Sequence, residues 1–207
     1  MSATVLAFDT ATTACTVALN IGNEIHERFE IAPRRHSELI IPMINDLLVE
    51  ASIKLQDLDA IAFGCGPGSF MGVRIATGIA QGLAFGIEKP VIPVSTLQTL
   101  AQTAYQETKA KNILAGWDAR MHEIYWGAYQ LGENGLMEAL IPDRLDKPDA
   151  VQLPKGGEWL AVGNAWANDF FPHAGAMVQV ALEKYRRGEV LLAEKAEPTY
   201  LRDKVTQ

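Results

Sequence analysis

The feature that most constrains this chain is a glycine-rich segment between a predicted strand and a predicted helix. It reads Gly64-Cys65-Gly66-Pro67-Gly68-Ser69-Phe70-Met71-Gly72-Val73-Arg74. The preceding apolar run, residues 60–63, is short, continuous and ended by glycine, which predicts a buried strand. Glycine permits a tight turn, and serine is a residue type that caps helices. Because such a turn directs backbone N–H groups outward, the segment is a candidate anion site.

The segment does not match two well-characterised phosphate-binding motifs. A Walker A loop ends in Gly-Lys-Ser/Thr, which is absent here. The dinucleotide fingerprint needs a third glycine where Ser69 stands. A Gly-x-Ser-x-Gly elbow is also absent, so Ser69 is better interpreted as a helix cap than as a nucleophile. The segment is therefore weak evidence for nucleotide binding, with Gly68 and Ser69 as candidate residues.

Asp9, at the end of the first predicted strand, is the third candidate nucleotide-binding residue. Its carboxylate could hold a metal-bound water, or it could cap the turn through residues 10–13, which is the commoner role. The four histidines form no HxxxH or HExxH pattern, and the two cysteines have no zinc-type spacing. We therefore predict no catalytic residue and no metal ligand, and we expect Cys15 and Cys65 to be reduced core thiols.

The composition limits the possible partners and compartments. The chain has 207 residues, 48% of them hydrophobic and 21% charged, which is ordinary for a globular protein. Its net charge of −7 argues against a protein that binds nucleic acid by itself. No apolar run reaches the roughly 18 residues of a membrane span, and the start lacks a signal-peptide pattern. We expect a cytoplasmic protein without membrane contact.

The periodicity predicts an α/β fold with a mixed sheet and two lobes. The order βββαβαβα covers residues 1–110, and a smaller, less regular lobe covers 111–207. Pro42 lies inside the predicted helix 37–50, so we expect a kink or a later start there. The predicted strands are 5–9, 14–20, 24–31, 60–63, 90–94, 112–117, 123–130 and 159–162, and the predicted helices are 37–50, 70–85, 95–108 and 177–187.

The helix after the glycine-rich segment carries two rows of small residues. Glycine inside a helix costs roughly 1 kcal/mol relative to alanine, so two of them need a compensating reason. Small residues allow close approach of a facing helix. Packing on the chain's own sheet explains one row, and we expect the second row to meet another protein. The rows are Gly72, Ala76, Ala80 and Ala84, and Gly78 with Gly82.

Five segments together resemble one family. They are Phe8-Asp9-Thr10-Ala11, His36-Ser37-Glu38, the glycine-rich segment, Asp118-Ala119-Arg120-Met121 and Pro198-Thr199-Tyr200-Leu201-Arg202. On these segments the chain resembles the TsaB (YeaZ) family, a bacterial branch of the actin-like ATPase superfamily with a ribonuclease H-like fold. The visible departure is Met71, where the family usually has threonine, and we expect it to alter surface detail only.

The resemblance implies a role in making threonylcarbamoyladenosine (t6A) at position 37 of tRNAs that read codons beginning with A. It implies a non-catalytic subunit that pairs directly with a TsaD-type subunit, works with a TsaE-type ATPase, and forms a homodimer when alone. tRNA would be met only through the complex. No cofactor of the chain's own is implied, because ATP or ADP and a TsaD-bound metal belong to the complex.

Three sequence features agree with a non-catalytic role. Related TsaD subunits carry a metal-binding HxxxH at positions matching Thr96 and Leu100, neither of which is a plausible replacement ligand. Actin-like kinases need a second Asp-x-Gly turn, and this chain has Asp118-Ala119-Arg120 there. The chain is also about half the length of a complete two-lobed ATPase of that class.

The sequence is consistent with two hypotheses about the function of the chain. In the first, the helices at 37–50 and 70–85 form a docking surface for the TsaD-type subunit. In the second, the chain is a reduced actin-like ATPase or kinase with its own nucleotide site at Asp9 and the Ser69 loop. The predicted docking residues are Ile40, Met43, Ile44, Leu47, Gly72, Ala76, Gly78, Ala80 and Gly82.

Overall fold

Side chains that alternate along the first strand assemble the first lobe. The computed structural model describes residues 3–202, and in it Leu6 and Phe8 join one core cluster while Val5 and Ala7 join another. Because successive side chains of a strand point to opposite faces, this sheet is buried on both sides. Its order is β3-β2-β1-β4-β5. The strands are β1 (Val5–Asp9), β2 (Ala14–Ile21), β3 (Glu24–Ile31), β4 (Ala60–Gly66) and β5 (Val91–Ser95).

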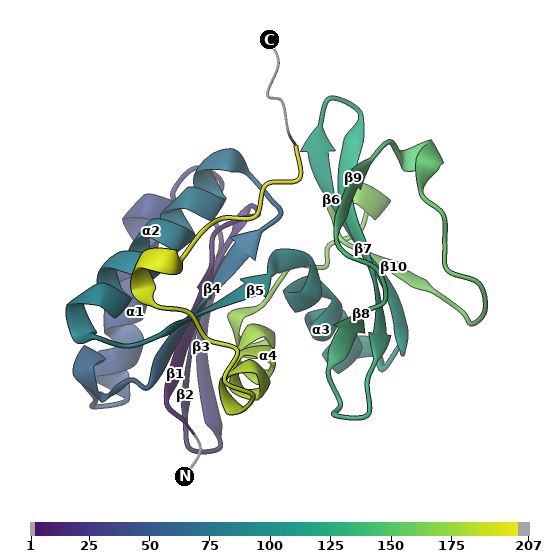
Figure 1. Cartoon of the computed structure of the whole chain (residues 1–207). Coiled ribbons are helices and arrows are strands. Elements are labelled where there is room, and N and C mark those ends of the chain that lie inside the picture. Colours follow the sequence, from purple (N-terminus) through teal and green to yellow (C-terminus); the bar gives the residue numbers. More distant parts are fainter. Residues whose placement is uncertain (1–2, 203–207) are drawn as a thin grey trace.

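Helices cover both faces of this sheet, as Figure 1 shows. Helices α1 (His36–Glu50) and α2 (Phe70–Ile87) pack on the face that carries Leu6 and Phe8. Helix α4 (Ala174–Arg186) packs on the opposite face. β1 pairs with β2 antiparallel and with β4 parallel, so the sheet is mixed, as predicted.

The second lobe is built on a second sheet, with α3 (Thr96–Thr108) packed on it (Figure 1). Leu97 and Leu100 of α3 meet Ile113 and Trp117 in one core cluster. The sheet has the order β10-β6-β7-β8, and β9 also pairs with β7. Its strands are β6 (Asn112–Arg120), β7 (Glu123–Leu131), β8 (Met137–Ala139), β9 (Arg144–Asp146) and β10 (Leu160–Val162).

The predicted elements are present, with a few shifted boundaries. Helix α1 begins at His36 and runs through Pro42, so of the expected kink or later start, the later start is wrong. Helix α4 begins at Ala174, three residues before the predicted start. The short strands β8 and β9 were not predicted, because three residues carry too little periodicity to be recognised.

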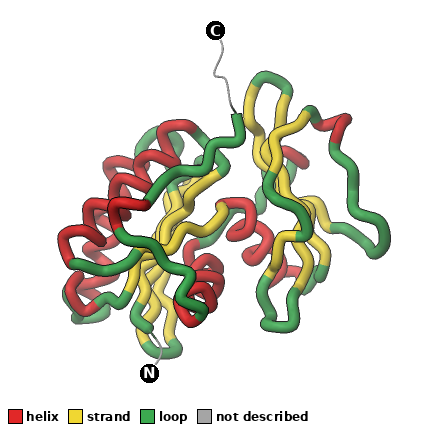
Figure 2. The backbone as a smooth tube through the Cα atoms, viewed as in Figure 1, coloured by secondary structure: helices red, strands yellow, loops and turns green. Residues whose placement is uncertain are grey.

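The predicted lobe boundary at residue 111 marks only the first place where the chain passes from the first lobe to the second. Helix α4 and the segment after it return to the first lobe, where Leu191 pairs with Val91 of β5. Figure 2 shows this segment running along the first lobe after α4. Residues 174–202 therefore do not belong to a second lobe of 111–207 as predicted, and residues 203–207 lie outside the described part of the chain.

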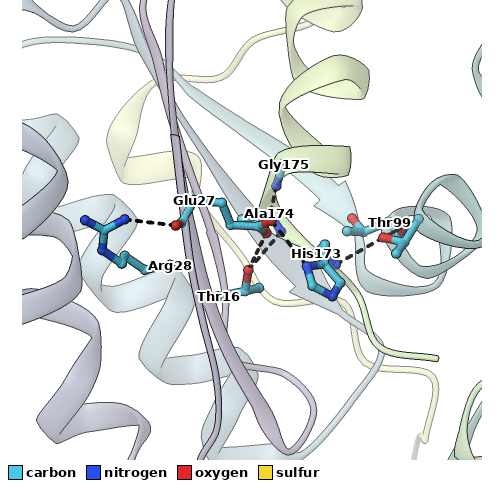
Figure 3. A network of polar contacts seen from close by, with 8 residues as sticks. Thr16, Glu27, Arg28, Thr99, His173, Ala174 and Gly175 are labelled. Atoms are coloured by element: carbon cyan, nitrogen blue, oxygen red, sulfur yellow. Dashed lines mark hydrogen bonds and ion pairs between the residues drawn. The ribbon is translucent and has the colours of Figure 1, made fainter. Parts of the chain in front are cut away.

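A polar network fixes the start of α4 on the first sheet (Figure 3). The Glu27 carboxylate accepts hydrogen bonds from Gly175 N (3.1 Å) and Thr16 Oγ1 (3.0 Å), and its other oxygen lies 3.2 Å from His173 Nδ1. Burial alone raises the pKa of Glu27, but the bonds from His173 and Gly175 outweigh it and hold the pKa below its usual value. A carboxylate at a helix N-terminus is also favoured by the helix dipole.

Candidate functional site between the lobes and on helix α2

The glycine-rich segment packs directly against the turn that follows β1. A Cβ added to Gly68 would lie 2.4 Å from the carbonyl oxygen of Ala11, and one added to Gly72 would lie 2.0 Å from that of Thr10. Real side chains cannot approach backbone atoms so closely. These two glycines therefore allow two loops of the chain to meet, which explains their presence without a phosphate.

The chain itself uses some of the N–H groups of this segment. Ser69 N donates to the Ala11 carbonyl oxygen (2.7 Å), and Gly72 N donates to Ser69 Oγ (3.0 Å). Ser69 is thus the N-cap of α2, which confirms the interpretation of its side chain as a cap. An anion above the loop would find these two donors already engaged.

Asp9 is buried and both of its carboxylate oxygens are engaged. Oδ1 accepts from Ala11 N (2.6 Å) and Oδ2 accepts from Thr96 Oγ1 (2.8 Å). Burial raises the pKa of Asp9 to about 6, against the lowering effect of these hydrogen bonds. A Cβ on Gly64 would lie 2.1 Å from Oδ2, so the neighbouring strand β4 packs directly against the carboxylate. The predicted role of Asp9 in capping the turn after β1 is confirmed.

Thr96 and Leu100, which the resemblance matches to metal-ligand positions of TsaD-type subunits, have internal roles. Thr96 is buried and bonded to Asp9, and Leu100 is fully buried in the core of the second lobe. Within residues 3–202 there is no group of three or more His, Cys, Asp or Glu residues that could hold a metal ion. Cys15 and Cys65 are both free and buried, and burial raises the pKa of the Cys15 thiol to about 12.

A cavity of about 860 Å³ lies between the two lobes. Gly68 and Ser69 line it, whereas Asp9 does not. Arg120 lines it from the second lobe and pairs with Asp118 at 3.1 Å. The long Arg120 side chain of the Asp118-Ala119-Arg120 turn therefore stands at the cavity. The volume is within the range of small-molecule sites, but the closed Asp9 carboxylate does not face it.

The C-terminal segment crosses this cavity and contacts both lobes. Thr199 N donates to the Cys65 carbonyl oxygen (2.7 Å) in the first lobe. Arg202 pairs with Glu123 (2.6 Å) and donates to the Ala119 carbonyl oxygen (3.1 Å) in the second. Neither contact was predictable from the sequence, because both join residues distant in sequence.

Six of the nine predicted docking residues are buried in the core of the first lobe. An α-helix that covers a sheet must bury one face, and these positions form that face of α1 and α2. A partner cannot reach them, so this part of the predicted surface is wrong. The buried residues are Ile40, Ile44, Leu47, Gly72, Ala76 and Ala80.

The other row of small residues faces outward on α2. Gly78 and Gly82 are exposed, and a Cβ added to either would have no heavy atom within 4 Å. Met43 is half-buried against the core. We call the exposed row, together with the exposed side chains on the same face of the helix, the α2 stripe. It consists of Met71, Arg74, Gly78, Gly82 and Phe85.

Helix α2 is unusually apolar for a helix with an exposed face. It is long and apolar enough to cross a membrane by length and composition alone, and 33% of the 18-residue window is buried in the fold. Phe85 is 73% exposed and Met71 is 63% exposed. One such helix is weak evidence for a membrane span, because a helix that packs on a soluble core passes the same test. Apolar surface of this kind also marks contacts between proteins.

The fold and site together define a class of protein. They describe a two-lobed mixed α/β protein of the actin-like ATPase, ribonuclease H-like type, in which the first lobe's acidic turn and glycine loop are closed on each other. The model of the family "TsaD: tRNA N6-adenosine threonylcarbamoyltransferase" matches residues 20–206.

Curated relatives then identify the family more narrowly. The chain is 41% identical to the tRNA threonylcarbamoyladenosine biosynthesis protein TsaB of Escherichia coli, over 97% of this chain and 95% of that protein. It is 38% identical to the protein of the same name from Haemophilus influenzae, over 98% and 95%. The solved structure of YeaZ from Pseudomonas aeruginosa matches with a TM-score of 0.92 and 42% identity, over 96% of this chain and 100% of that chain. The chain belongs to the TsaB family.

Proposed function

We propose that this chain is a non-catalytic subunit of the machinery that transfers a threonylcarbamoyl group to adenosine 37 of tRNAs reading codons that begin with A. It works by docking onto a TsaD-type subunit, and a TsaE-type ATPase completes the complex. Membership of the TsaB family supports the pathway. The observation that carries the docking role is the exposed α2 stripe.

The state of the Asp9 site supports a non-catalytic role. The Asp9 carboxylate is buried, accepts hydrogen bonds from Ala11 and Thr96 of its own chain, and does not line the cavity between the lobes. Thr96, which matches a metal-ligand position of TsaD-type subunits, provides one of those bonds. Asp9 therefore holds the chain's own loops together and leaves the transfer chemistry to its partner.

The α2 stripe has the composition of a helix-docking surface. Gly78 and Gly82 leave the helix backbone accessible at its centre, and Met71 and Phe85 flank them with exposed apolar side chains. Small residues between larger ones allow a second helix to approach closely. The same stripe can pair two copies of the chain in the absence of the TsaD-type subunit, which gives the homodimer.

Cofactors and tRNA are assigned to the complex. The chain has no cofactor of its own, and ATP or ADP and the metal are bound with its partners. A net charge of −7 is unfavourable for direct contact with phosphates, so tRNA is met through the complex. The whole assembly operates in the cytoplasm.

Co-elution of the purified chain with the TsaD-type subunit tests the docking role. Gly78→Glu places a charge in the α2 stripe and replaces glycine by a better helix former, so it cannot act by unfolding α2. We expect it to abolish co-elution. Gln152→Glu, an exposed position in the second lobe with the same charge change, should leave the complex intact. Normal binding by Gly78→Glu would show that another surface docks the partner.

Calorimetry with ATP and Mg²⁺ on the isolated chain tests the alternative, a reduced ATPase or kinase. The closed Asp9 site predicts no binding tighter than roughly 10 μM, which corresponds to about 7 kcal/mol of specific contacts. Tighter binding accompanied by hydrolysis would favour the enzyme.

A further inference from the structure

The charge distribution along α2 supports one inference that rests on the proposed docking of this helix. Arg74 is the single charged residue in the 18 residues of α2. It lies on the same row as Gly78 and Gly82, because helical residues four apart share a face. A partner that covers the α2 stripe therefore also covers Arg74.

Two aromatic rings hold the Arg74 guanidinium in place. Its Cζ lies 3.3 Å from the centroid of the Phe70 ring and 4.9 Å from that of the Tyr200 ring. Its Nη1 donates to the Phe70 carbonyl oxygen at 3.1 Å. Guanidinium groups stack on aromatic faces and keep their N–H edges available for hydrogen bonds. The side chain is thus ordered before any partner arrives.

Within the described part of the chain, no anion lies beside the ordered guanidinium. Among residues 3–202, no carboxylate lies within 4.0 Å of Arg74, although Arg120 and Arg202 at the same cavity pair with Asp118 and Glu123. Arginine keeps its charge at any physiological pH, and burying an unpaired charge is strongly unfavourable. A protein that buries this end of α2 must therefore bring an anion of its own.

We propose that Arg74 is a preformed receptor for a carboxylate side chain of the partner that docks on α2. Phe70 and Tyr200 act as positioning residues, since they hold the guanidinium and do not themselves contact the carboxylate. Tyr200 belongs to the C-terminal segment that contacts both Cys65 and Glu123. The receptor is complete only while that segment lies across the cavity, which links docking to the arrangement of the two lobes.

Titration calorimetry with the purified TsaD-type subunit, at low and high salt, tests this assignment. Arg74→Gln should weaken binding by about 30-fold or more and reduce its salt dependence, because a hydrogen-bonded charge pair is lost at a covered site. Tyr200→Ala should weaken binding less, and Tyr200→Phe, which keeps the ring, should bind like the parent chain. Arg144→Gln is the matched control, because Arg144 is an exposed arginine on β9 that does not line the cavity.

The outcomes separate this inference from the proposed function. Parent-like affinity of Arg74→Gln, together with loss of binding in Gly78→Glu, overturns the carboxylate receptor and leaves the docking role standing. Parent-like affinity of both variants overturns both. If the isolated chain binds ADP and Arg74→Gln abolishes that binding, Arg74 serves a small ligand of the cavity, and the receptor for a partner's carboxylate is wrong.

Discussion

At the scale of single residues, the raised pKa of Asp9 makes a prediction about pH. An unfolded aspartate titrates near 3.8, and burial raises the pKa to about 6 in the folded chain. Between these values the folded state binds more protons, so the contribution of Asp9 to stability is full below pH 3.8 and declines as the pH rises through 6. The decline is on the order of 3 kcal/mol.

The variant Asp9→Asn should lack this decline. Its amide cannot ionise, and its oxygen and nitrogen can still meet Ala11 N and the Thr96 hydroxyl. Urea unfolding at pH 4 and pH 7 should show the variant gaining stability relative to the parent chain as the pH rises. Asp46→Asn, at an exposed position on α1, is the control. Parallel pH profiles for the Asp9 variant and the parent chain would contradict the burial argument.

Residue roles were predictable where they depend on near neighbours. Ser69 caps α2 through Gly72, three residues away, and the local pattern was sufficient to predict it. The bond between Asp9 and Thr96 spans 87 residues, and no pattern in the sequence connects them. The sequence therefore allowed two roles for Asp9, holding a metal-bound water or capping the turn after β1. The fold shows Thr96 beside its carboxylate.

At the scale of elements, α2 offers a matched pair of glycine variants. Gly72→Ala would force a Cβ to within 2.0 Å of the Thr10 carbonyl oxygen, so the loop and the helix must move apart. Gly78→Ala meets open space and gains helix propensity of about 1 kcal/mol. Thermal unfolding should show the first variant destabilised by more than about 1 kcal/mol and the second stabilised. Equal effects at both positions would contradict the assignment of one inner and one outer row.

The anchor of α4 makes a second prediction for an element. Glu27→Gln removes the charge that faces His173 and the start of the helix (Figure 3), and should cost about 1–2 kcal/mol at pH 7. Since the folded pKa of Glu27 lies below its usual value of 4.5, the difference from the parent chain is full above pH 4.5. It shrinks as the pH falls through the folded pKa.

Urea unfolding at pH 7 and at pH 4 or below measures this difference. Glu30→Gln on the same strand, where the carboxylate pairs with Arg35 at the surface, should have a much smaller effect. A penalty for Glu27→Gln that does not change with pH would mean that packing, and not charge, fixes the start of α4.

Helices and strands with a clear hydrophobic period were predicted from the sequence, whereas the exposed docking residues were predicted only in part. The apolar spacing of α1 and α2 identified both helices, but periodicity does not tell which face a sheet will cover. Ile40 and Ala76 were therefore assigned to a partner although both face the core. The two rows of small residues on α2 predicted two packing faces. The chain fills one of them itself, and the row with Gly78 and Gly82 is exposed.

At the scale of the whole molecule, the C-terminal segment should restrict the motion of the lobes. Arg202→Ala removes the ion pair with Glu123 and the hydrogen bond to the Ala119 carbonyl oxygen. The Arg202 side chain is 17% exposed and that of Glu123 is 32% exposed. Hydrogen exchange should become faster in residues 118–123, while the distant turn at 21–24 stays unchanged. Arg144→Ala on β9 controls for loss of a surface arginine. Unchanged exchange in residues 118–123 would show that the segment does not hold the lobes.

The number of lobes was predictable and their exact membership was not. The change from regular to irregular pattern near residue 110 marks the first crossing of the chain. The return at residues 174–202 is decided by long-range contacts such as the pairing of Val91 with Leu191, which leave no mark in composition. A linear division of the sequence cannot represent a chain that comes back to its first lobe.

The central claim is that this chain contributes a docking surface and no chemistry of its own. The most direct test is the rate of threonylcarbamoyl transfer to tRNA in a mixture reconstituted with TsaD-type and TsaE-type partners. Asp9→Asn should support transfer at close to the parent rate, and Gly78→Glu should reduce it to the rate without the chain. Loss of transfer with Asp9→Asn and normal transfer with Gly78→Glu would contradict the claim.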